Sequence, residues 1–170
     1  MLFPTHLLAG FLLGQRWTRL PVWAAVGAAL PDLVDKPLGT VGATELYHSV
    51  GHSLLPVLGL ALAWLLARRV DGPDDRLFAV GLGWASHLCL DVLGIALNGR
   101  PENWVLLLWP VREKPNPLGL DPMAFYFEYL WSWSFYAEIV VWVVGAYVLL
   151  HTVVRRPLPT ITDPGPGERR

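Results

Sequence analysis

Three long runs of apolar residues dominate the chain and predict helices that cross a membrane. They cover Ser53 to Ala67, Leu77 to Leu97 and Ser134 to Val154. Crossing the hydrocarbon core of a bilayer takes about 20 apolar residues, and these runs reach or approach that length with their flanks. A fourth run, Leu2 to Leu13, is shorter but extends to Trp17. The pattern therefore predicts four spanning helices.

A second short apolar run lies between the first two of these helices. It covers Val22 to Leu30 and stops at Pro31, a residue that ends many helices because it has no backbone N–H. Half-depth helices occur within membranes where they line a cavity inside the protein. We therefore predict an all-α, multi-pass transmembrane bundle with about four spanning helices and one short half-depth or re-entrant helix.

Two later segments differ from the apolar runs. Residues 98–130 contain five prolines among charged and aromatic residues, and we interpret them as a long external loop with amphipathic pieces. Residues 157–170 are rich in proline and glycine, which predicts a disordered tail. We expect residues 1–156 to form a single transmembrane domain.

The composition agrees with a membrane protein. Of the 170 residues, 54% are hydrophobic and 16% are charged, whereas soluble domains average about 25% charged residues. The nine tryptophans suit aromatic belts at the membrane surfaces. A formal net charge of −1 gives no reason to expect nucleic-acid binding. The single cysteine, Cys89, excludes an internal disulfide framework and most thiolate metal sites.

The arginines predict an orientation, because basic residues gather on the cytoplasmic side of a membrane. Seven of them follow the first helix, separate the two central helices or follow the last helix: Arg16, Arg19, Arg68, Arg69, Arg76, Arg155 and Arg156. All seven fall on one side if the N-terminus is outside. We therefore expect a multi-pass protein of the plasma (inner) membrane, with its N-terminus outside and its C-terminus in the cytoplasm.

In this topology the polar residues at membrane depth gather near the outer surface. They are His6, Asp32, Asp35, His48, His52, His87 and Asp91. Histidine and aspartate are costly inside a membrane and commonly mark a functional site there. The orientation came from basic residues alone, so this gathering is an independent observation.

The spacing of these residues indicates a metal site. Asp32 and Asp35 are three residues apart, and both the pair His48 and His52 and the pair His87 and Asp91 are four apart. Residues three or four apart share one face of a helix, so each pair can aim two ligands at one point. Imidazole and carboxylate suit Zn²⁺, with Mn²⁺ or Fe²⁺ as alternatives. We expect one to three ions.

Each motif also has an ordinary explanation. A histidine in a membrane is commonly a hydrogen-bonded core residue, and an aspartate after a proline is commonly a helix cap. His151 is such a case, because it lies near basic residues and has no acidic companion; we interpret it as interfacial. Three pairs at one depth favour a shared metal site, and the neighbouring acids favour a bare ion over haem.

Five stretches resemble a known family. They read FPTHLLAGFLLG, ALPDLVDKP, HSVGHSLL, GWASHLCLDVL and VLLLWPV. They follow one another as in the membrane-bound metal-dependent hydrolases, the inner-membrane proteins known as LexA-regulated or LexA-binding hydrolases, and the resemblance covers about residues 3 to 111. It implies a multi-pass bacterial or archaeal membrane protein with a hydrolytic metal site. Its polar matches are His6, Asp32, Asp35, His52, Ser53, His87 and Asp91.

The chain departs from the family at His48, where members often have arginine. His48 is therefore either an extra ligand or a substitute for an anion-binding cation. The order of ligands is also similar to that of the zinc-dependent phospholipases C, although this looser likeness covers only the motif logic.

These residues predict metal-assisted hydrolysis of a phosphoester in a phospholipid or lipid-linked substrate. A bound metal lowers the pKa of water from 15.7 towards about 7. We expect Asp35 to be the general base, as well as a candidate ligand, with His48 as a second catalytic residue. The basic residues of the external loop, Arg100, Arg112 and Lys114, are candidates to attract the anionic head of the substrate.

Two other classes of function stay open. A closed set of ligands would suit a structural metal site in a non-catalytic regulatory or scaffold protein of the membrane. A metal transporter is the third option, which the half-depth helix favours slightly.

Overall fold

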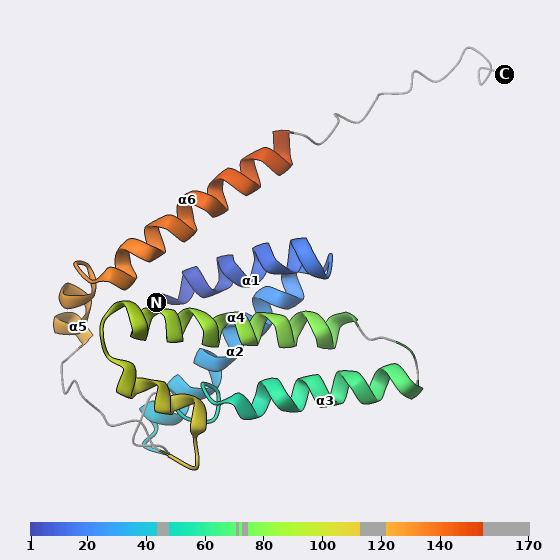
Figure 1. Ribbon diagram of the computed structural model, residues 1–170, viewed down its shortest axis with the longest axis horizontal. Coiled ribbons are helices and arrows are strands. Elements are labelled where there is room, and N and C mark those ends of the chain that lie inside the picture. The colour runs from blue at the N-terminus through green and yellow to red at the C-terminus, as the bar shows by residue number, and fades with distance from the viewer. Residues whose placement is uncertain (44–47, 71, 73–74, 113–121, 155–170) are drawn as a thin grey trace.

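The computed structural model describes residues 1–43, 48–70, 72, 75–112 and 122–154 (Figure 1). Its helices are, in chain order, α1 (Phe3–Trp17), α2 (Pro21–Thr40), α3 (Leu54–Val70), α4 (Asp75–Leu97), the 3₁₀-helix η1 (Pro101–Leu108), α5 (Pro122–Tyr129) and α6 (Trp133–Val154). These described residues contain no β-strand, which confirms the predicted all-α class. The predicted tail, residues 157–170, lies outside them.

Helices α1, α2 and α4 form the centre of the molecule. Helix α2 packs against both α1 and α4, and α3 packs along α4. Figure 1 shows that the start of α1, the start of α3 and the end of α4 lie towards the same end of the bundle. Helix α6 contacts α1 and α4, and its later turns diverge from the bundle.

Two helices are long and apolar enough to cross a membrane. They are Asp75–Leu97 and Trp133–Thr152. Helices α1 and α3 have 15 and 17 residues, fewer than the about 20 that a span normally takes. Length and composition thus give weak support for membrane association, and the bundle of four spanning helices stays a prediction.

The predicted end of the short helix at Pro31 is wrong, because α2 continues beyond it; the depth of α2 in a membrane stays a prediction. Helix α2 is one helix of 20 residues with Pro31 and Pro37 inside it. The side chains that follow Pro31 find partners only if the helix continues. Asp32 accepts a 2.8 Å hydrogen bond from Lys36 one turn later, and Asp35 is bonded by the segment before α3. These contacts help to offset the backbone hydrogen bonds that the two prolines cannot donate.

The segment from His48 to Ser53 forms bends and turns rather than the first turn of α3. Helix α3 begins at Leu54, and the Ser53 hydroxyl accepts a hydrogen bond from the Leu55 N–H at 3.3 Å, as a helix cap does. His48 and His52 therefore do not share a helix face, and that part of the sequence prediction is wrong. Their four-residue spacing brings the rings together by another route, described below.

Small residues bring the backbones of α2 and α4 into direct contact. A Cβ added at Gly83 would lie 1.9 Å from the Ala24 carbonyl oxygen, and one added at Gly27 would lie 2.1 Å from the Val80 carbonyl oxygen. Ala24 and Ala28 are fully buried in the same contact. Such close approach is a common way to join helices in membranes. It fixes the position of α4 along α2, and with it the residues that both helices carry.

A buried acid joins the second turn of α6 to the start of α1. Glu138 accepts hydrogen bonds from the Leu2 backbone N–H and from the Tyr129 hydroxyl, the latter at 2.7 Å. Burial, followed by this contact with Glu138, raises the pKa of Tyr129 well above its usual value, so the hydroxyl stays a donor. The acid near the start of the last apolar run is therefore a structural partner.

Candidate metal centre

Two histidines from different elements face each other at the centre of the predicted site. The Nδ1 of His87, on α4, lies 2.7 Å from the backbone oxygen of Ala28 on α2. Because a carbonyl only accepts hydrogen bonds, Nδ1 carries a proton, and in the neutral ring Nε2 then has a free lone pair. His52 likewise donates from Nδ1 to Asp35 Oδ2 at 2.8 Å. In the neutral rings the two Nε2 atoms are therefore both acceptors, and they lie 3.2 Å apart.

Asp91 brings a third acceptor to the same point. Its Oδ2 lies 3.3 Å from His87 Nε2 and 3.5 Å from His52 Nε2. Ligands held about 2.0–2.1 Å from a tetrahedral ion are about 3.3 Å from one another. Both histidines are only 1% exposed, so water does not relieve the repulsion among these lone pairs. The arrangement therefore fits a divalent metal ion.

His6 and Asp32 lie beside these atoms. The His6 ring stacks on His87 with centroids 3.7 Å apart, and its Nε2 lies 3.3 Å from both Asp91 Oδ1 and the Met1 carbonyl oxygen. Because both partners accept, Nε2 donates in this arrangement and Nδ1 is the His6 nitrogen that offers a lone pair. Its Nδ1 is buried and has no hydrogen-bond partner within the described part of the chain. Asp32 places Oδ1 3.6 Å from His52 Nε2. Three overlapping groups have ligand atoms within 4.8 Å of one another: His6, His87 and Asp91; Asp32, His52 and His87; His48, His52 and Asp91.

Asp35 lies behind His52 rather than among these groups. It is fully buried. Its Oδ2 accepts from the Ser49 N–H, the His52 N–H and His52 Nδ1, and its Oδ1 accepts from the Ser49 hydroxyl and the Gly51 N–H, all at 2.6–3.0 Å. A carboxylate offers about four lone-pair positions, so these five contacts occupy it. We therefore revise its predicted role from general base and ligand to a residue that positions His52.

The three sequence pairs meet the site in different ways. His87 and Asp91 share a face of α4 and lie in contact, as their spacing predicts. Asp32 and Asp35 both face His52, but they approach opposite nitrogens of its ring. His48 is half-buried and meets the His52 ring edge-on, with centroids 4.5 Å apart. It belongs to one of the three candidate groups, and it is less buried than the other site histidines.

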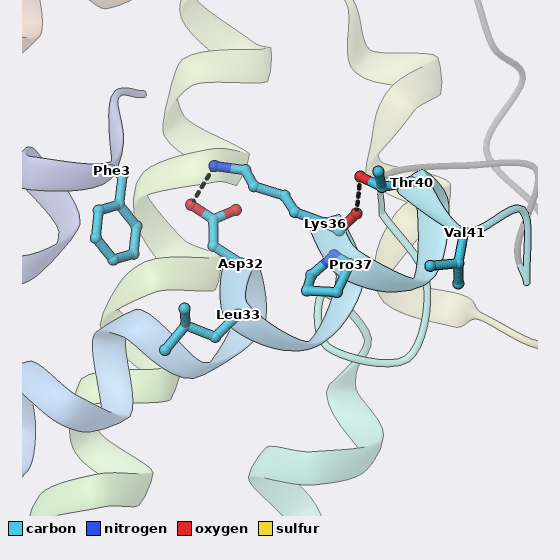
Figure 2. A pocket seen from close by; sticks show the side chains of 7 residues that line it. All are labelled: Phe3, Asp32, Leu33, Lys36, Pro37, Thr40 and Val41. Atoms are coloured by element: carbon cyan, nitrogen blue, oxygen red, sulfur yellow. Dashed lines mark hydrogen bonds and ion pairs between the residues drawn. The ribbon is translucent and has the colours of Figure 1, made fainter.

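A cavity of about 600 Å³ lies beside Asp32, along the second half of α2 (Figure 2). Of the basic residues predicted to bind substrate, Arg100 and Arg112 are not among its lining residues. Lys114 lies outside the described part of the chain. The basic side chain that does line the cavity is Lys36.

Several contacts that shape the site were not among the predictions. The Ala28 carbonyl sets the tautomer of His87, and the Trp84 Nε1–H donates to the Gly51 carbonyl at 2.8 Å, which holds the turn that carries His52. A backbone carbonyl leaves no trace in a sequence, so Ala28 could not have been found. Lys36 could have been, because it lies four residues after Asp32 and pairs with it at 2.8 Å.

Comparison of the chain with protein-family models, curated proteins and solved structures found no match. The family resemblance of its five stretches therefore stays a prediction.

Proposed function

We propose that the protein is a membrane-embedded, metal-dependent hydrolase that cleaves a phosphoester in a phospholipid or lipid-linked substrate. One observation carries the metal part of this proposal. Asp35 and the Ala28 carbonyl hold the two facing histidines as Nδ1–H tautomers, and the free Nε2 lone pairs converge on Asp91. Two imidazole nitrogens and a carboxylate that converge in this way suit a divalent cation.

The residues that would hold the metal are five members of the three candidate groups: His6, Asp32, His52, His87 and Asp91. Imidazole with carboxylate favours zinc, and manganese or iron(II) suits the same donors. A bound divalent ion supplies a Lewis acid that lowers the pKa of water towards about 7. In the hydrolysis, the water oxygen forms a bond to phosphorus, the ester P–O bond breaks, and the leaving oxygen gains a proton.

Asp35 and His48 would support that reaction in other ways than as metal ligands. Asp35 holds His52 in the tautomer that offers Nε2, as carboxylates behind metal-bound histidines commonly do. His48 is our candidate to accept the proton of the attacking water, because it borders the ligands and is partly exposed.

The membrane setting of the proposal comes from two sources. Helices α4 and α6 are long and apolar enough to span, and the arginine distribution favours an outer N-terminus. The site then lies near the outer headgroups, where lipid phosphoesters are found. The test is labelling of single cysteines in Cys89→Ser protein, with Arg69→Cys expected to react from the cytoplasm and Arg112→Cys from outside. The reverse pattern would put the site near the inner leaflet.

The cavity beside Asp32 favours a hydrolase over a structural metal site. A structural site is closed by its protein ligands, whereas a catalytic site leaves room for water or substrate. Asp32 belongs both to a candidate ligand group and to the wall of the cavity, so the cavity adjoins the cluster on that side.

The activity test uses purified protein in nanodiscs with panels of phospholipids and polyprenyl phosphates. We expect turnover that a chelator abolishes and zinc restores, and that His87→Ala lacks. His151→Ala is the matched control, because this exposed histidine stacks on Tyr147, away from the ligands. If no substrate is turned over by protein whose metal site is fully occupied and closed to water, the structural or transport alternatives are favoured.

A further inference from the structure

The cavity beside Asp32 joins an apolar wall to one charged pair. Its apolar walls come from Phe3, Leu33, Pro37 and Val41, and its charged residues are Asp32 and Lys36. Figure 2 shows the Lys36 side chain reaching across towards Asp32, with Phe3 and Leu33 beside the pair. An apolar space with a few convergent polar groups is the usual form of a ligand site.

Asp32 connects this cavity with the candidate metal ligands. Its Oδ1 lies 3.6 Å from His52 Nε2, inside the cluster, and its Oδ2 accepts a 2.8 Å hydrogen bond from Lys36 Nζ. A single carboxylate therefore separates the ammonium group from the metal ligands. An anionic group at the cluster would lie beside Lys36.

The Lys36 side chain is paired with Asp32 but remains accessible to an incoming anion. The Lys36 side chain is 55% exposed, whereas that of its partner Asp32 is 10% exposed. Nζ also lies 5.7 Å from the centroid of the Phe3 ring, which favours a cation at this position. Lysine is a compact point charge with three donors, suited to a phosphate oxygen.

We propose that this cavity binds the apolar chain of a phosphate-bearing amphiphile and that Lys36 binds its phosphate, which sets substrate specificity. The inference rests on the proposed function and deepens it, because it assigns substrate binding to the second half of α2. A free phosphate would leave the apolar wall unused, and a neutral lipid would leave Lys36 without a partner other than Asp32. The amphiphile matches both parts of the cavity.

The test is calorimetric titration with dodecyl phosphate in a maltoside detergent, in the presence of a chelator so that binding is measured without metal. Dodecanol and inorganic phosphate are the two half-probes. We expect dodecyl phosphate to bind more tightly than either. Lys36→Gln should weaken dodecyl phosphate binding about tenfold, since a charged hydrogen bond is lost, and should leave dodecanol binding unchanged. Lys36→Arg should retain the affinity.

Two further variants check the location. Because Thr40 lines the cavity, Thr40→Trp should fill it and weaken the binding of dodecyl phosphate and of dodecanol alike. Arg68→Gln, which removes a cation at the far end of α3 that stacks on Trp64, should change neither. Equal affinity of dodecyl phosphate for wild type and Lys36→Gln would overturn the proposal, as would unchanged binding in Thr40→Trp.

This outcome is separate from that of the metal proposal. If the wild type binds no metal but its affinity for dodecyl phosphate still depends on Lys36, the hydrolase proposal is refuted and the amphiphile site is kept. Metal-dependent turnover with no effect of Lys36→Gln on dodecyl phosphate affinity would keep the hydrolase and refute Lys36.

Discussion

The two halves of α2 have opposite characters. The first half carries Ala24, Gly27 and Ala28, which have no polar side-chain atoms and let α2 touch the backbone of α4. The second half carries Asp32 and Asp35, which face His52 from two sides. The boundary between them is the Ala28 carbonyl, which orients His87. Backbone contact along the first half therefore holds His87 of α4 beside the second half, whose acids face His52.

The largest effect should come from separating the backbones. Gly83→Ala places a Cβ where it would be 1.9 Å from the Ala24 oxygen, and backbone cannot move aside as a side chain can. We expect a loss of about 3 kcal/mol of stability and weaker metal binding, because His87 moves away from Ala28. Thermal unfolding in detergent and metal titration measure both.

Gly81→Ala is the matched control on the same helix. A Cβ there meets only the Leu60 Cβ, at 3.7 Å, so the variant should keep both the fold and the metal. Equal stability of Gly81→Ala and Gly83→Ala would contradict the role of the backbone contact.

The next effect sharpens the role of the second half. In Asp35→Asn, either orientation of the amide turns its NH₂ towards an N–H donor, because both carboxylate oxygens accept from backbone N–H groups. Loss of a partner behind a metal-bound histidine typically lowers metal affinity by about 10–100-fold. We expect a decrease of this size in a competition titration against a chelator.

A general base would behave differently. Its removal would leave metal affinity unchanged and lower turnover by about 10²-fold. Unaltered metal affinity in Asp35→Asn would therefore restore the sequence-based role of this residue and reject the positioning role.

The smallest effect tests the turn that presents His52. Trp84→Phe removes the N–H that bonds to the Gly51 carbonyl at 2.8 Å, which should cost about 1 kcal/mol and weaken metal binding less than Asp35→Asn does. Trp64→Phe is its control, because the buried Trp64 Nε1 has no hydrogen-bond partner among the described residues. If both variants lose the same stability in thermal unfolding, the hydrogen bond to Gly51 is not the cause.

The sequence predicts contacts within a helix better than contacts between elements. His87 and Asp91 lie together because helical geometry places residues four apart on one face. The apolar runs likewise correspond to α1, α3, α4 and α6. In contrast, α2 continues through Pro31, where the local preference of proline predicts a helix end. Its continuation involves partners of Asp32 and Asp35 that lie outside this local stretch.

The site shows the same division. The residue types and their gathering at one place could be predicted, and six of the seven polar candidates belong to a group able to hold an ion. The seventh, Asp35, has the same side chain as Asp32 and lies three residues later. Its role follows from the turn at residues 49–52, and no pattern along α2 contains that information.

The most direct test of the central claim is the metal content of purified protein, measured by elemental analysis after zinc reconstitution and removal of loosely bound ions. We expect at least one tightly bound ion in the wild type and in His151→Ala, and none in the double variant His52→Ala/His87→Ala with its fold intact. Equal metal content in the wild type and the double variant, or no bound ion in either, would contradict it.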